Sequence, residues 1–169
     1  IEPKAGGGFQ AIIPIAEVAD LLQVSRLDFL GEIPADSSAS VETIAVNAAP
    51  VPPSNVLFVR TVDISIKGPD DTRSLPAAIE FHIMKQWLDD QSVSLDDVVL
   101  FRHKNEWTEL PTTHLGSMVG SENQLYERFS AETPGFSIFA VGMGYDEAVS
   151  ESVPTVVVQP TATQIPVVT

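Results

Sequence analysis

The sequence contains no cysteine among its 169 residues, so it has neither a disulfide framework nor a thiolate metal site. It also has no run of about 18 apolar residues, the length that a helix needs to cross a bilayer. Basic residues are scarce: nine Lys and Arg stand against 23 Asp and Glu. The formal net charge of -14 opposes binding to a nucleic-acid backbone or an anionic membrane surface, so we expect neither partner.

Recognisable catalytic motifs are missing too. The sequence has no G-x-S-x-G elbow, no P-loop and no G-x-G-x-x-G, and we therefore expect a protein that is not an enzyme. A carbohydrate-active enzyme stays open as a minor alternative, because a sequence does not show whether two carboxylates face each other across a cleft. The start, "IEPKAGGGFQ", lacks the basic and apolar stretches of a signal peptide, and we expect it to be a processed or trimmed start.

What the sequence does contain is apolar residues, 44% of the total, arranged with the two-residue period of strands. Alternation is clearest in "NVLFVRTVDISIKG" and returns in "IEFHIM", which predicts two half-buried strands. The residues expected in the core are Val62, Ile64, Ile66, Ile79, Phe81 and Ile83, and those expected on the opposite faces are Thr61, Asp63, Ser65, Glu80, His82 and Met84.

Further short strands are expected at intervals of about eight to twelve residues, which is typical of an antiparallel sandwich. One short helical turn is expected near 85–91, within "KQWLDDQSVSLDD". The predicted fold is an all-β antiparallel sandwich, Ig-like or jelly-roll-like, with extended termini. The later strands are expected in "VVLFRH", "WTEL", "TTHLGSMVG", "QLYERFSAE" and "FSIFAVG".

Three regions are expected along the chain. Residues 1–10 form a flexible lead-in around "AGGG", residues 11–145 form the sandwich, and residues 146–169 form an extended tail rich in Val, Thr and Pro.

Several blocks of the sandwich region occur in the order typical of one family. These are "IEFHIMKQWLDDQSVSLDDVVLFRH", "EWTELPTTHLG" and "LYERFSAETPGFSIFAVG". In these blocks the sequence resembles the PGF-pre-PGF domain of archaeal cell-surface proteins, most strongly over 79–142. The resemblance implies a β-rich, extracellular, surface-located protein with a structural role, and it supplies no catalytic or ligand residues. Members often continue into a Thr/Pro-rich spacer and a membrane anchor.

The "TPGF" block in this resemblance has a physical interpretation. Pro134 fixes its own φ and Gly135 permits a positive φ, so the segment from Thr133 to Phe136 is expected to form a tight type II turn. Phe136 would then return to the core. We expect a structural corner at this point.

Metal ligands are weakly indicated. His82, His103 and His114 lack the spacing that pre-sets a zinc site, and we expect ordinary histidines. No cofactor is expected, although calcium at acidic turns stays open. Trp87 and Trp107 are expected to pack in the core in preference to forming a sugar platform. The acidic pairs are Asp70 and Asp71, Asp89 and Asp90, and Asp96 and Asp97.

The tail "ESVPTVVVQPTATQIPVVT" has no charged side chain after Glu151. Ordering such a segment costs about 1–2 kcal/mol per residue, which pairing and burial together would have to offset. Pro154 and Pro160 bracket about one strand's length, which suits a strand added at a sheet edge. The residues expected to mediate this strand exchange are Val153, Val156, Val157, Val158, Ile165, Val167 and Val168.

Two functions follow from a tail of this kind. We favour a subunit of an extracellular filament or surface lattice in which each copy gives its tail to the next, since head-to-tail contacts that do not close make filaments. The apolar "FQAIIPI" offers a second exchangeable strand. The expected partners are copies of the same chain and possible envelope proteins or glycans. The alternative is a monomeric display or adhesin module whose tail is a spacer toward a membrane anchor.

Overall fold

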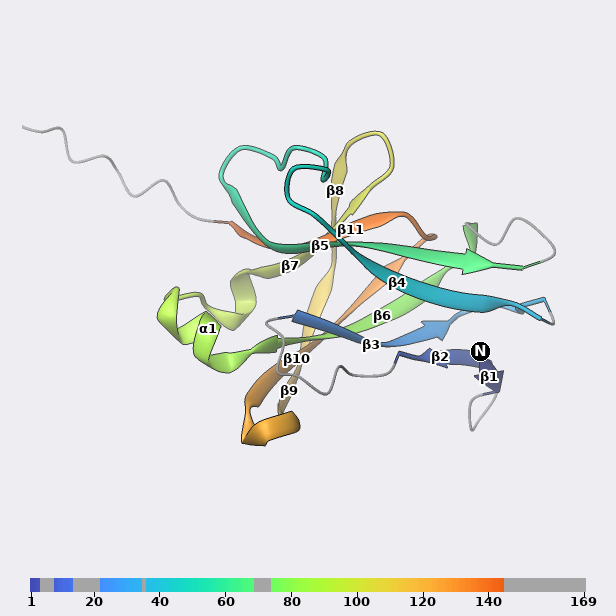
Figure 1. Cartoon of the computed structure of the whole chain (residues 1–169), viewed down its shortest axis with the longest axis horizontal. Helices are drawn as coiled ribbons and strands as arrows, with labels where there is room; N and C mark the ends of the chain where they lie inside the picture. The colour runs from blue at the N-terminus through green and yellow to red at the C-terminus, as the bar shows by residue number, and fades with distance from the viewer. Residues whose placement is uncertain (4–7, 14–21, 35, 69–73, 145–169) are drawn as a thin grey trace, which may run out of the picture.

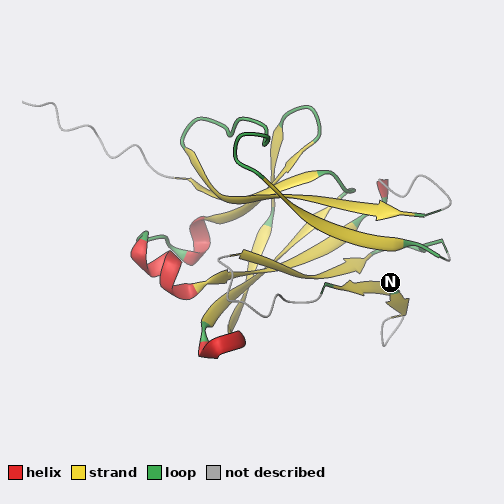
Figure 2. Cartoon of the chain, viewed as in Figure 1, coloured by secondary structure: helices red, strands yellow, loops and turns green. Residues whose placement is uncertain are grey.

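The structure is a computed structural model, and it describes residues 1–3, 8–13, 22–34, 36–68 and 74–144. The described chain forms two antiparallel sheets that face each other across a shared core (Figure 1). Sheet A has six strands in the order β1-β2-β3-β6-β10-β9, and sheet B has five in the order β4-β5-β11-β7-β8. The predicted all-β sandwich is thereby confirmed, as the strand content in Figure 2 also shows.

The described chain consists mainly of strands, joined by short helices and loops. In chain order they are β1 Glu2–Pro3, β2 Phe9–Ile12, β3 Leu22–Phe29, β4 Ser38–Ile44, β5 Val56–Lys67, β6 Ala77–Met84, α1 Lys85–Asp90, η2 Leu95–Asp97, β7 Val98–His103, β8 Trp107–Leu110, β9 Thr112–Val119, η3 Ser121–Asn123, β10 Leu125–Thr133 and β11 Ile138–Gly144.

The core is built from the facing sides of both sheets. Leu27 and Ile79 of sheet A and Ile64 and Phe139 of sheet B are all at most 1% exposed. The short helix predicted near 85–91 is present as α1, and its Leu88 joins the same core. Val, Ile and Phe on strands fill this layer because branched and aromatic side chains pack well on a pleated surface.

The core face predicted for β5 is confirmed by buried Val62, Ile64 and Ile66, although Thr61 on its other face is also buried, and β6 departs further from its prediction. Ile79, Phe81 and Ile83 are fully buried as expected, but Glu80 and His82 on the opposite face are also buried, at 7% and 4% exposure. The expectation of a half-buried β6 was therefore wrong. The physical reason is that β6 lies between β3 and β10, whose long side chains cover its outer face.

The N-terminal segment contributes to the chain's own sheet. Phe9–Ile12 pairs with β3, and Glu2 and Pro3 pair with β2. Of the two candidate exchange strands, "FQAIIPI" thus pairs within its own subunit over the residues that form β2.

The corner at Thr133–Phe136 buries its phenylalanine. The Thr133 hydroxyl donates a hydrogen bond to the Gly135 carbonyl oxygen at 2.6 Å, and the Phe136 ring lies 5.7 Å from that of Phe29. The described glycines with a positive φ are Gly8 and Gly116. The chain therefore bends here without the left-handed glycine that a type II turn requires.

A second aromatic cluster lies on the outer face of sheet B. Phe101 follows the core residue Leu100 on β7, so it points away from the core, yet it is 2% exposed. Its ring and that of Trp107 pack against Phe58, at 5.5 and 4.7 Å between centroids. Trp87, by contrast, packs against the main core as expected.

Candidate assembly surface

The tail residues predicted to exchange, Val153 to Val168, lie outside the described residues. What the structure describes is the set of sheet edges that a donated strand can join. An exposed strand edge carries unpaired N–H and C=O groups and is a template for another strand, unless it is short, interrupted by proline or bulged. The strands at the edges are β1 and β9 in sheet A and β4 and β8 in sheet B.

Three of these edges are blunted. β1 has two residues, one of them Pro3, and β8 has four. β9 has eight residues, but its register with β10 shifts so that Leu115 has no partner, and Gly116 beside it has φ of 100°. This is a β-bulge, which bends an edge and interrupts its pairing.

β4 is the long and regular edge. Its seven residues pair with β5 without interruption, from Ser38 opposite Lys67 to Ile44 opposite Thr61. Within the described part of the chain, no backbone hydrogen bond joins β4 to any strand other than β5. Its outer edge therefore presents alternate backbone groups with which a sixth strand of sheet B could pair.

A groove of about 750 Å³ runs beside this edge. On one side it is lined by residues 38–41 of β4, and on the other by residues 10–13 around the end of β2 together with Ile1 and Glu2, so apolar and polar side chains alternate along it. Ile12 is 60% exposed, so the groove offers apolar surface that another segment can cover.

The segment that contains β4 is nearly uncharged, although Asp63 and Lys67 lie opposite it on β5 and Glu2 lines the groove beside it. Residues 37–59 contain a single charged side chain, that of Glu42, although the chain as a whole carries -14. The strand β4 was not predicted from the sequence. In β4, Ala39, Val41 and Thr43 alternate with Ser and Glu residues, and this pattern is only weakly apolar. The charge gap over 37–59 was the signal that could have found it.

A buried polar cluster lies on the outer face of sheet A. The carboxylate of Glu80 accepts hydrogen bonds from Arg128 at 2.9 and 3.1 Å and pairs with the Arg26 guanidinium at 2.7 Å. His82 Nε2 lies 3.0 Å from the Ser25 hydroxyl and 3.3 Å from Glu80. These contacts join β3, β6 and β10.

The pKa values of Glu80 and His82, the two titratable residues of β6, are both shifted in this cluster. Burial alone would raise the pKa of Glu80, but hydrogen bonds from Arg128 and His82 and the charges of both arginines outweigh it, and the pKa is lowered. Burial lowers the pKa of His82, against the opposing effect of Glu80. Ionised glutamate and neutral histidine are thus the forms that the fold favours.

The three histidines lie in separate places. His82 belongs to the buried cluster, His103 packs against Trp107, and His114 Nε2 lies 2.7 Å from Glu127, which also accepts a hydrogen bond from Ser117. Among the described residues, no group of three His, Asp or Glu side chains is placed to hold a metal ion.

The acidic pairs are also dispersed. Asp89 and Asp90 end α1, and Asp96 and Asp97 lie in η2. The pair at 70–71 lies outside the described residues.

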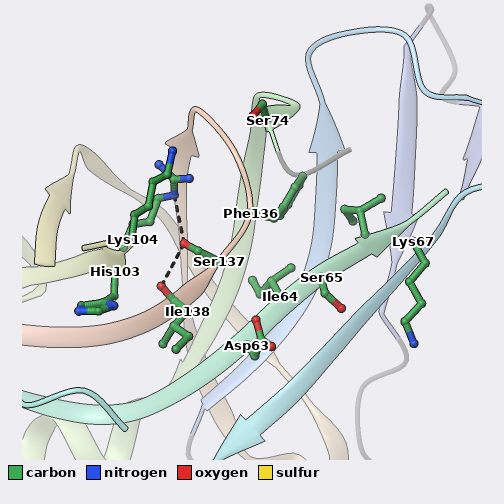
Figure 3. A pocket seen from close by; sticks show the side chains of 12 residues that line it. Asp63, Ile64, Ser65, Lys67, Ser74, His103, Lys104, Phe136, Ser137 and Ile138 are labelled. Carbon is green, nitrogen blue, oxygen red and sulfur yellow. Dashed lines mark hydrogen bonds between the residues drawn. The ribbon is translucent and has the colours of Figure 1, made fainter. Parts of the chain in front are cut away.

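A hollow of about 670 Å³ opens at the opposite side of β5 from β4. It is bounded by the end of β5, the end of β7 and the start of β11, and Phe136 and Ile64 contribute its apolar wall (Figure 3). Lys67, Arg102 and Lys104 line it, and Arg102 donates a hydrogen bond to the Ser137 hydroxyl at 3.2 Å. We call this the cationic hollow.

Comparison with known proteins gives no match: no family model, no curated protein and no solved structure matches the chain. Over the described residues, the fold and the edge geometry define an all-β sandwich with one long edge, β4, that pairs on one side only. None of the helices in the described ranges is long and apolar enough to span a membrane.

Proposed function

We propose that the protein is a non-enzymatic structural subunit of an extracellular surface filament or lattice, assembled when the tail of one copy adds a strand to β4 of the next. The observation that carries the proposal is the regular, seven-residue β4 edge beside a groove with exposed apolar residues. The resemblance of 79–142 to the PGF-pre-PGF domain supports the location at a cell surface.

Length and chemistry match between donor and acceptor. The segment bracketed by Pro154 and Pro160 holds five residues, about the length of one strand, and β4 offers seven. Val156 and Val158 share one face of an extended chain, so they can both turn toward the groove while backbone groups pair with β4.

Electrostatics favour the same pair of segments. Two copies with a net charge of -14 repel each other, and the repulsion is least where the contacting segments are uncharged. Residues 152–169 carry no charged side chain and 37–59 carry one. The donor is therefore uncharged, and the acceptor strand β4 carries one charge, that of Glu42.

Deleting Val153–Thr169 tests the proposal. The shortened chain should keep its β-sheet circular dichroism and Tm and stay monomeric by light scattering, while the full chain assembles. Assembly that persists after the deletion would contradict it. A full chain that is monomeric at all concentrations would favour the display-module alternative.

A further inference from the structure

The cationic hollow gathers three cations for which no carboxylate partner is found among the described residues, in a chain where acids outnumber bases by 23 to nine. Elsewhere in the described ranges, Arg26 and Arg128 pair with Glu80, and Lys85 pairs with Asp89. The cations that pair with no carboxylate of the described part of the chain line the hollow instead: Lys67, Arg102 and Lys104.

Such a grouping is unexpected on charge alone. In a molecule with an excess of acidic residues, most Lys and Arg side chains have a carboxylate within reach. Several cations seldom lie together in such a molecule by chance. We propose that the cationic hollow binds an extended acidic peptide, and that the ligand is the segment Asp146–Glu151 of a second copy. That identity rests on the proposed assembly, whereas recognition of an acidic peptide does not.

The spread of the cations favours an extended ligand. Lys104 and Lys67 lie on opposite sides of the hollow, with Ser137 and Ser65 between them (Figure 3). Their strands β7 and β5 flank β11, which places the backbones about 10 Å apart. A single small anion reaches one side, while a peptide with several carboxylates reaches both.

The segment before the tail has this pattern. In "YDEAVSES", Glu151 follows Asp146 and Glu147 by four or five residues, which is about 13–17 Å in an extended chain. Carboxylates at both ends can therefore meet cations on both sides. Arg102 is oriented by its hydrogen bond to Ser137, which uses one of its five N–H donors.

One acidic residue opposes the ligand. Asp63 lines the same hollow and reduces its positive charge. Neutralising this residue should therefore change peptide affinity in the opposite direction to removing a cation. Asp63→Asn should tighten peptide binding about twofold or more, while removal of cations should weaken it.

The experiment measures binding of a peptide of residues 145–154 to the full chain whose own segment is neutralised (Asp146→Asn, Glu147→Gln, Glu151→Gln). NMR shift titration at low salt should give saturable binding, and the same peptide with Asn and Gln for its acids should not bind. Adding Lys67→Glu and Lys104→Glu to the protein should weaken binding at least tenfold. Lys85→Glu, the matched control on α1, should change it less than twofold.

Three results would overturn the inference: equal binding of the acidic and the neutral peptide, an equal effect of Lys85→Glu, or sulfate that binds as tightly as the peptide. Because the peptide is added to single molecules, binding is scored whether or not the protein assembles. A failed assembly with retained peptide binding would remove the proposed function and leave the acidic-peptide site.

Discussion

At the scale of single residues, the positions of glycines and charged residues explain features of packing and of pH-dependent stability that the amino-acid composition does not predict. Gly142 lies in β11 beneath the aromatic cluster on the outer face of sheet B. A Cβ atom there would lie 2.8 Å from Phe58 and 2.9 Å from both Phe101 and Val56. The absent side chain is what lets these rings close over the strand.

Gly142→Ala should therefore destabilise the protein by about 1–3 kcal/mol, since the added methyl group overfills a packed cluster. In a domain of this size each kcal/mol lowers Tm by about 2–4 °C. Gly31→Ala is the matched control, because nothing lies within 4 Å of its Cβ position. Equal Tm values for both variants in a thermal melt would contradict the packing described for Gly142.

The buried polar cluster on sheet A makes stability depend on pH. Because the pKa of His82 is lowered in the folded state, the unfolded chain takes up this proton first as the pH falls below about 6.5, and stability falls with it. The lowered pKa of Glu80 extends the loss to more acidic pH, where the carboxylate in turn is protonated.

His82→Gln should flatten the decrease in Tm between pH 7 and pH 5, since glutamine does not titrate. The measurement is a series of melts of both proteins across that range. If the variant loses as much Tm as the wild type over these two pH units, His82 is not the titrating group.

At the scale of elements, local alternation predicted much of the sandwich but not its long-range partners. β7 occurs at "VVLFRH" as expected, and β8 to β11 match their predicted segments within two residues at each end. The burial of Glu80 was missed because its partner Arg128 is 48 residues away, and nothing local reveals it. β4 was missed because Ser and Ala dominate its sequence.

In the candidate site, too, the sequence predicted the local features and not the features that depend on long-range contacts. The sequence predicts a donor strand in the neutral tail, because valine spacing and flanking prolines are local properties, and this prediction lies outside the described residues. It did not identify an acceptor, because an edge exists only once strand order is known. Similarly, the cationic hollow joins Lys67 and Lys104, which are far apart in the sequence and are brought together by β11.

The donor strand itself can be tested by placing charge on it. Val156→Asp combined with Val158→Asp should abolish assembly, since in the proposed assembly both side chains would face the groove beside β4, and a buried carboxylate without a partner is costly. Thr161→Asp with Thr163→Asp adds the same charge beyond Pro160 and should leave much of the assembly intact. Light scattering compares the two; equal loss in both would indicate a general charge effect.

At the scale of the whole molecule, the net charge of -14 sets how copies approach one another. Between 0.1 M and 1 M salt the Debye length falls from about 10 Å to about 3 Å. Screening removes repulsion between the acidic bodies, whereas apolar burial and backbone hydrogen bonds along β4 persist.

Assembly at fixed protein concentration should therefore increase as NaCl is raised over this range, as followed by sedimentation. Peptide binding in the cationic hollow should weaken over the same range, because it depends on ion pairs. An assembled fraction that falls steadily with salt would mean that charge pairing, and not strand addition, holds the copies together.

The most direct measurement of tail-to-β4 contact exploits the absence of cysteine. One protein carries Glu42→Cys on β4, a second carries Val157→Cys in the tail, and a short bismaleimide crosslinker is added to their mixture. Strand exchange predicts a crosslinked pair containing one of each, identified by mass spectrometry, and far less product when Thr113→Cys on the bulged β9 replaces Glu42→Cys. Equal crosslinking at both edges, or assembled protein without a crosslink between positions 42 and 157, would contradict the addition of the tail to β4.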